Sequence, residues 1–253
     1  MVDVPCILLK FKYSFYYWKE KMWSIVDRKV KLPRIWSNNE LKKISSLFYG
    51  SVINVSGWKD IDKQGSTYRE YFCNASEYWI SNYVAEAKGF QGDISNEFFL
   101  DLKNDLDKDL VENFDVVFNH TVLEHIFDCR KAFKNICLLS KDIVIIIVPF
   151  MQHQHASYGD YWRFTPECIV HIFQKNGLEV LYINYNDGKN QSIYVFAVGS
   201  KKPQSWQKIR ALQGNKIDRY TEKVGHRVVS QGVIYCIYIF FSRVSRKVKS
   251  FLK

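Results

Sequence analysis

Residues 143–148 read Ile-Val-Ile-Ile-Ile-Val, six consecutive β-branched residues. A run of this kind predicts a strand buried on both faces, which is typical of the middle of a parallel sheet. Upstream of it, residues 114–119 form a second apolar strand, and Asp128 is placed to cap a helix that continues to Leu139. Strand, helix and strand in this order predict a βαβ unit, and therefore an α/β fold.

The chain before residue 114 continues the alternation. Ser37 and Glu40 form a capping box for a helix that Gly50 is expected to end. Leucines every four residues predict an amphipathic helix over residues 100–113. Short apolar runs predict three more strands, at residues 52–55, 78–83 and 90–94.

The chain after residue 148 closes the sheet. Thr165 is expected to cap a helix that has Pro166 in its first turn and Gly177 at its end. Residues 178–184 and 192–198 are joined by a polar turn, which favours a hairpin. We therefore expect a doubly wound, mostly parallel seven-stranded sheet with an antiparallel last strand. In such sheets ligands bind at the carboxyl ends of the strands.

Composition excludes several classes of protein. The chain has 253 residues, of which 47% are hydrophobic and 25% charged, so wholesale disorder is excluded. No apolar run approaches the roughly 18–20 residues that span a bilayer, and residues 1–9 lack the basic start and cleavage site of a signal peptide. The six cysteines contain no C-x-x-C pair, so we expect reduced thiols in a cytoplasmic protein, with Cys73, Cys129, Cys137 and Cys168 on apolar faces.

The net charge of +10 is concentrated at one end of the chain. Residues 201–253 hold 13 Lys and Arg against 2 Asp and Glu, whereas residues 1–200 are near neutral. We expect an aromatic and basic extension at 1–36, a main domain at 37–200 and a basic tail at 201–253. Residues 233–253 have the pattern of an amphipathic helix on an anionic membrane surface, with packing against protein as the alternative. No nucleic-acid-binding motif accompanies the charge.

Two stretches resemble a known family. Residues 114–117 (Phe-Asp-Val-Val) and 122–125 (Val-Leu-Glu-His) resemble the fourth-strand motif of class I S-adenosylmethionine-dependent methyltransferases. Residues 148–166, with Val-Pro-Phe, two histidines and Asp-Tyr-Trp-Arg-Phe-Thr-Pro, resemble a type 11-like subset found in bacterial cell-surface polysaccharide pathways. The resemblance covers about residues 40–200 and implies a Rossmann-like methyltransferase fold.

The resemblance also implies S-adenosylmethionine as the cofactor and methyl transfer, chiefly to an oxygen of a sugar or related small acceptor. The loops after the first four strands are expected to hold the methionine moiety, the ribose and the adenine. The residues at these positions are Asn54, Ser56 and Gly57, then Asn82, then Asp93 and Ile94, and finally Asn119 and His120.

The acceptor is expected near residues 150–163. His155 is the candidate general base, since an imidazole commonly takes a proton near neutral pH. Asp160 and Arg163 are candidates for a catalytic substrate wall, with an internal ion pair as the alternative. His153 and His155 could share a metal with Asp160, but a site needs three or four ligands, so no metal is expected.

A second hypothesis stays open. The turn after residue 55 contains a single glycine, and asparagines stand at 54 and 82 where acids are common in the family that the chain resembles. This pattern also suits a non-catalytic, methyltransferase-like partner subunit. A nucleotide-sugar enzyme of another type is disfavoured because the chain lacks a G-x-G-x-x-G fingerprint.

Overall fold

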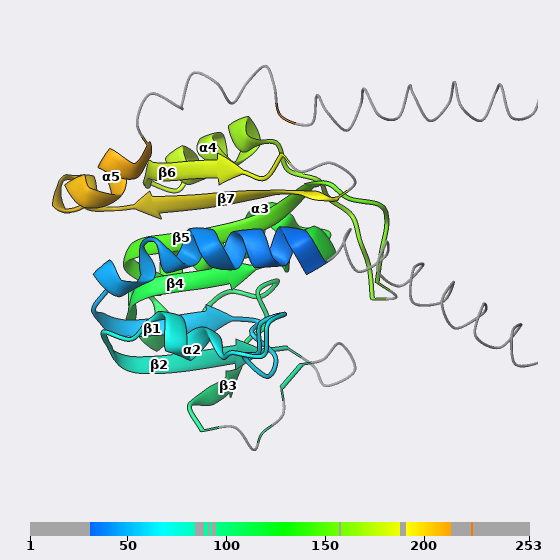
Figure 1. Ribbon diagram of the computed structural model, residues 1–253. Helices are drawn as coiled ribbons and strands as arrows, with labels where there is room; N and C mark the ends of the chain where they lie inside the picture. Colours follow the sequence, from blue (N-terminus) through cyan, green and yellow to red (C-terminus); the bar gives the residue numbers. More distant parts are fainter. Residues whose placement is uncertain are drawn as a thin grey trace, which may run out of the picture.

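A computed structural model describes residues 31–83, 89–90, 92, 95–156, 158–187, 191–213 and 224. It contains a seven-stranded sheet in the order β3-β2-β1-β4-β5-β7-β6 (Figure 1). Only β7 runs antiparallel to its neighbours, so the predicted doubly wound, mostly parallel sheet is confirmed. The strands are β1 (Gly50–Val55), β2 (Ala75–Asn82), β3 (Glu97–Phe99), β4 (Phe114–His120), β5 (Ser140–Met151), β6 (Glu179–Tyr185) and β7 (Ile193–Ser200).

The run at 143–148 forms the centre of β5, and its side chains alternate between two cores. Val144, Ile146 and Val148 pack on the face covered by α3 (Cys129–Leu139) and α4 (Pro166–Lys175). Ile143, Ile145 and Ile147 pack on the opposite face. That face is covered by the helix of residues 31–42, α2 (Tyr68–Tyr71) and α5 (Gln207–Gln213) (Figure 1). Both faces of the sheet are therefore buried, as the β-branched run predicted.

Two helix starts are confirmed at the level of single hydrogen bonds. The Asp128 carboxylate accepts from the Lys131 amide at 3.2 Å, and the Thr165 hydroxyl accepts from the Cys168 amide at 3.1 Å. Gly177, just beyond α4, has a φ of 75°, which is the left-handed conformation that ends helices.

The capping box at Ser37 and Glu40 was a wrong prediction. Residues 31–42 are helical, so Ser37 lies inside the helix, where its hydroxyl donates to the Arg34 carbonyl at 2.9 Å. Glu40 is buried and accepts a 2.5 Å hydrogen bond from the Tyr182 hydroxyl. Gly50 begins β1 instead of ending this helix, which is followed by the 3-10 turn η1 (Ser45–Leu47).

Two predictions between β2 and β4 were also wrong. The third strand is Glu97–Phe99 and not residues 90–94. Residues 100–113 form turns and a 3-10 helix, η3 (Lys108–Leu110), in place of the predicted amphipathic helix. The Asp101 carboxylate accepts from the Lys103 amide, and the Asn135 side chain donates to the Leu102 carbonyl, so these residues have local and tertiary partners that a helix would not give them.

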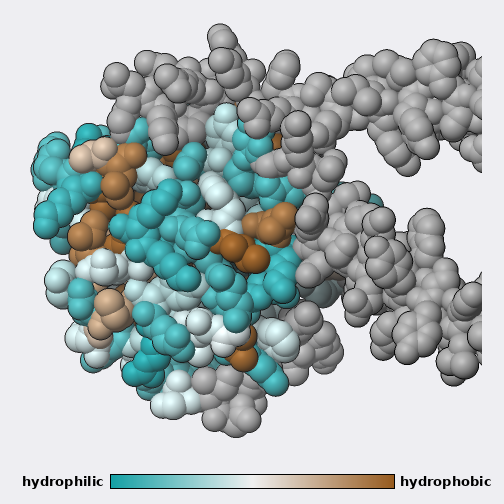
Figure 2. Space-filling model, in the orientation of Figure 1, coloured by the Kyte–Doolittle hydropathy of each residue, from teal (hydrophilic) through white to brown (hydrophobic). Residues whose placement is uncertain are grey.

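Residues 1–30 and 233–253 lie outside the described residues, so the expected extension is described only from residue 31 and the amphipathic tail not at all. No described helix is long and apolar enough to cross a membrane. Figure 2 shows the face that carries the helix of residues 31–42 as largely hydrophilic, with hydrophobic side chains gathered on the side where α5 lies. Cys129 and Cys137 are buried and Cys168 is half-buried, but Cys73 is exposed, contrary to its predicted apolar setting.

Candidate functional site

The strand order places the topological switch point of the sheet between β1 and β4, where open α/β sheets commonly form a ligand crevice. β2 and β3 lie on one side of β1 in the sheet, whereas β4 and β5 lie on its other side. The loops that follow β1 and β4 therefore run in opposite directions. Such a switch point is where open α/β sheets bind ligands. Three segments meet at this edge: the loop after β1, the turn after β4 with the 3-10 helix η4 (Leu123–His125), and the loop between β5 and α4.

The loop after β1 has an unusual backbone that the neighbouring strand holds in place. Ser56, Trp58 and Asp60 have φ values of 58°, 50° and 59°, a conformation costly for residues other than glycine. The side chain of Asn82, at the end of β2, accepts from the Trp58 amide at 2.7 Å and donates to the Trp58 carbonyl at 3.1 Å. Asn82 therefore acts as a clamp on this loop, and its amide group is directed at Trp58.

The residues beneath this loop form a buried hydrogen-bonded support. A Cβ atom at Gly57 would lie 2.5 Å from the Asn54 amide nitrogen, so only glycine fits there. Asn54 donates to the Asp60 carboxylate at 2.7 Å, and that carboxylate also accepts from the Tyr78 hydroxyl at 2.6 Å. Burial raises the pKa of Asp60, and the bonds from Tyr78 and Asn54 oppose that rise. Asn54 thus points into the protein, whereas Ser56 and Gly57 are partly exposed.

Of the two candidate residues at the end of β4, Asn119 is buried and His120 is half-buried. Asn119 donates to the Val55 carbonyl at 3.0 Å, which ties β4 to β1, and its Oδ1 atom has no hydrogen-bond partner among the described residues. His120 lies 2.9 Å from the Ser37 hydroxyl and 3.1 Å from the Thr121 hydroxyl. Burial holds the pKa of His120 well below its usual value, so this ring is neutral and links β4 to the helix of residues 31–42.

The ribose and adenine positions are described in part. Asp93 and Ile94 lie outside the described residues. Glu97 on β3 accepts a 2.5 Å hydrogen bond from the Asn82 side chain and a 2.9 Å bond from the Gly92 amide. A carboxylate therefore stands beside the end of β2 although the residue at that end is an asparagine. The sequence analysis missed Glu97 because the third strand was placed at 90–94.

We expect Asn82→Ala to lower the free energy of unfolding by about 2 kcal/mol, because it leaves the amide and carbonyl of Trp58 without their side-chain partner. Thermal unfolding followed by circular dichroism measures this change. Ser81→Ala is the matched control, since the Ser81 hydroxyl is buried and has no hydrogen-bond partner among the described residues. Equal melting temperatures for the two variants would contradict the clamp.

On the other side of the crevice, an ion pair braces the loop between β5 and α4. Arg163 bonds both oxygens of Asp160, at 2.6 and 2.7 Å, and the Asp160 side chain has no exposed surface. Arg163 also donates to the carbonyls of Gln152 at 2.9 Å and His153 at 3.1 Å. The hydrogen bonds from Arg163 hold the pKa of Asp160 well below its usual range. The structure thus contains the internal ion pair that was the alternative to a substrate wall.

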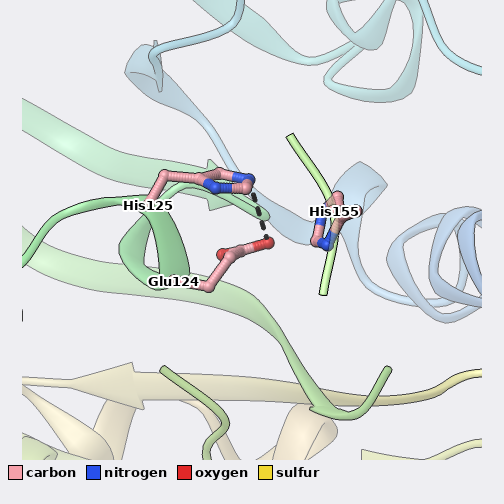
Figure 3. Close-up of side chains that lie close together, drawn as sticks. All are labelled: Glu124, His125 and His155. Carbon is pink, nitrogen blue, oxygen red and sulfur yellow. Dashed lines mark ion pairs between the residues drawn. The ribbon is translucent and has the colours of Figure 1, made fainter. Parts of the chain in front are cut away.

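Asp160 in turn positions His155. The Asp160 carboxylate accepts from the His155 amide at 2.7 Å and lies 3.1 Å from the ring Nδ1 atom. The His155 ring lies 5.1 Å from that of His125, centroid to centroid. Beside them lies Glu124, whose side chain is fully buried and whose pKa is raised by that burial to about 8. Figure 3 shows these three side chains close together. From the sequence, Glu124 and His125 follow the end of the fourth strand, where His125 is a second candidate base, but nothing in the sequence places them beside His155.

Arg34 is a further residue at this edge that the sequence analysis missed. Its guanidinium donates to the Thr121 hydroxyl at 2.8 Å, directly after β4, and its charge acts on Glu124 and Tyr194. The sequence offered no signal for this role, because residues 1–36 were assigned to an extension outside the main domain. The helix of residues 31–42 crosses that expected boundary and brings Arg34 to the crevice.

Comparisons with known proteins support the fold. Neither protein-family models nor curated proteins match the chain. Among solved structures, the chain is similar to one in the complex of the Haloferax volcanii Trm112 methyltransferase activator with a protein assigned as a methyltransferase; the identity is 14%, the TM-score 0.50, and the match covers 74% of this chain and 95% of that one. At this identity the likeness shows the fold alone.

Two further solved structures have lower TM-scores. An S-adenosylmethionine-dependent methyltransferase from Clostridium acetobutylicum is 13% identical, with 72% of this chain and 98% of that chain covered and a TM-score of 0.47. The 1,6-didemethyltoxoflavin-N1-methyltransferase of Burkholderia thailandensis, crystallised with S-adenosylhomocysteine, is 13% identical, with coverage of 78% and 88% and a TM-score of 0.46.

Proposed function

We propose that this chain is an S-adenosylmethionine-dependent methyltransferase that transfers a methyl group to an oxygen of a sugar or a related small acceptor. The observation that supports this most is the set of side chains and loops gathered at the switch point between β1 and β4. A constrained, partly exposed loop lies on its β1 side, and a histidine braced by a buried ion pair lies on its β5 side. In this proposal the cofactor and the acceptor would bind next to each other at this edge of the sheet.

The residues on the β1 side fit the cofactor. The partly exposed backbone of Ser56 and Gly57 would contact its methionine moiety, and the Glu97 carboxylate would accept from its ribose hydroxyls. The buried Oδ1 atom of Asn119, which no described residue satisfies, is an acceptor at the floor of the crevice. When bound, the cofactor supplies an electrophilic methyl group on a sulfonium, and the protein supplies alignment and a base.

On the acceptor side, His155 would take the proton of the acceptor hydroxyl. Asp160 accepts from the His155 amide and lies 3.1 Å from Nδ1, so its charge would stabilise the imidazolium that forms when the ring takes a proton. Arg163 holds Asp160, and so acts as a positioning residue. Tyr158, Tyr161 and Trp162 are exposed on the same loop, and such rings suit the apolar faces of a sugar.

Titration calorimetry of the purified chain with S-adenosylmethionine and S-adenosylhomocysteine tests this proposal. We expect saturable heat with both ligands, and weaker binding in Glu97→Gln if that carboxylate holds the ribose. Glu77→Gln is the matched control, because Glu77 is an exposed acid near the opposite end of β2. Absence of heat at millimolar ligand would contradict the proposal.

One observation favours the second candidate, a non-catalytic methyltransferase-like partner subunit. The side chains of Asn54 and Asn82 are used in internal hydrogen bonds, so neither offers the free polar group that the resemblance placed there. The same calorimetry separates the two functions, because a partner subunit needs no cofactor. A role in a polysaccharide pathway and attachment to a membrane surface rest on the sequence alone.

A further inference from the structure

Three side chains that could each donate one metal ligand converge beside the crevice. Glu124 and His125 come from η4, and His155 comes from the loop after β5 (Figure 3). Their candidate ligand atoms all lie within 4.8 Å of one another. The Glu124 carboxylate and the Nε2 atom of His125 are 3.7 Å apart. Segments about thirty residues apart in sequence therefore bring two imidazoles and one carboxylate to a single point.

Glu124 lacks the partners that a buried carboxylate normally has. Its side chain has no exposed surface, and neither of its oxygens accepts a hydrogen bond from a described residue. Burial of an unpaired carboxylate is costly, so such groups are usually paired, protonated or bound to a metal. The two nearby arginines are already engaged, Arg163 with Asp160 and Arg34 with Thr121.

Each of the two histidine rings lies close to an oxygen atom of another residue, as the imidazoles of metal sites commonly do. Nδ1 of His125 lies 2.6 Å from the Gly159 carbonyl, and Nδ1 of His155 lies 3.1 Å from the Asp160 carboxylate. The hydrogen bond to the Gly159 carbonyl fixes the His125 ring and leaves its Nε2 lone pair available to a cation. Asp160 is itself held by Arg163, so the orientation of His155 is set by a rigid pair.

We propose that Glu124, His125 and His155 form a binding site for one divalent transition-metal ion. Two imidazoles and a carboxylate are a ligand set for zinc, iron, cobalt or manganese, and they leave at least one coordination position open. Bond lengths of about 2.0–2.2 Å place tetrahedral ligand atoms roughly 3.3 Å apart, so the 3.7 Å separation of Glu124 and His125 needs only a small adjustment. Magnesium is excluded by its preference for oxygen ligands.

This inference goes beyond the proposed function and does not depend on it. It also changes the role of His155, because an imidazole that binds a cation cannot accept a proton with the same lone pair. In the metal-bound protein the acceptor oxygen would bind at the open position, where the cation lowers the pKa of its hydroxyl. A chelator therefore stops methyl transfer if the cation activates the acceptor, and leaves it unchanged if His155 is the base.

The test is cobalt binding to the full chain, purified in the presence of a chelator and then freed of it. We expect one equivalent of Co²⁺ to bind, with visible absorption bands of nitrogen and oxygen ligation and without the charge-transfer band of a thiolate. Glu124→Gln should weaken binding by at least about 100-fold, since loss of outer-shell partners alone costs about 10–100-fold. Added Mg²⁺ should not compete.

His153→Ala is the matched control, because His153 is an exposed histidine of the same loop that is not part of the cluster. It should bind Co²⁺ like the native chain. Failure of the native chain to bind Co²⁺ or Zn²⁺, or a Glu124→Gln variant of native affinity, would overturn the metal site. Neither result bears on cofactor binding, which the calorimetry with S-adenosylhomocysteine measures separately.

Discussion

His155→Ala is expected to lower the rate of methyl transfer about 10²–10⁴-fold, the contribution that a positioned acid–base group commonly makes. The affinity for S-adenosylhomocysteine should stay unchanged, because His155 lies on the loop after β5 whereas the proposed cofactor residues lie after β1, on β3 and at the end of β4. The measurement is transfer of labelled methyl groups to cell-surface glycan precursors, together with calorimetry of the product nucleoside.

His153→Ala provides the control for this prediction. His153 is exposed, and its carbonyl, which accepts from Arg163, is unaffected by a change of side chain. We expect its rate to match that of the native chain. A native rate for His155→Ala would remove His155 from the mechanism of methyl transfer.

The parts of the fold that could be predicted from sequence are those decided by local chemistry. Six β-branched residues place β5 in the middle of the sheet because few other structures bury every side chain of such a run. Asp128 and Thr165 mark helix starts because their side chains bond amides three residues on. These signals depend on neighbours along the chain, so a single sequence contains them.

The wrong predictions come from residues whose partners are distant in sequence. Ser37 and Glu40 have the spacing of a capping box, but they bond His120 and Tyr182 instead. The leucines at 102, 106 and 110 have helical spacing, yet Asn135 bonds the carbonyl of Leu102 and helps to hold this segment in turns. Three-residue β3 has too few side chains to show an alternation of apolar and polar residues.

The same limit applies to the site. The sequence placed His155 beside Asp160 and Arg163 because these residues are close along the chain. It did not place His155 beside Glu124 and His125, whose proximity follows only from the parallel pairing of β4 with β5. Arg34 reaches Thr121 across 87 positions, and no pattern within the N-terminal residues indicates this contact. Contacts between buried polar groups that are distant in sequence can therefore be seen only in the structure.

Arg163→Ala should be among the most destabilising substitutions in the described part of the chain. It removes both hydrogen bonds from Arg163 to the Asp160 carboxylate and leaves this charge, which has no exposed surface, without its arginine partner and with the His155 amide as its remaining hydrogen-bond donor. Breaking a buried ion pair in this way costs about 3–5 kcal/mol, and we expect the lower end because the loop lies near solvent. About 3 kcal/mol corresponds to a fall in melting temperature of roughly 6–12 °C for a domain of this size.

Thermal unfolding of three variants tests the cause of this loss. Lys131→Ala breaks the exposed pair of Lys131 with Asp105 and should leave the melting temperature nearly unchanged, because water screens such a pair. The double variant Asp160→Asn/Arg163→Ala should recover part of the stability lost in Arg163→Ala, because it removes the stranded charge. A melting temperature of Arg163→Ala within about 2 °C of the native value would contradict the bracing role.

If the loop is braced as the hydrogen bonds indicate, His155 loses its position in Arg163→Ala, so methyl transfer and cobalt affinity should fall together even in the folded variant.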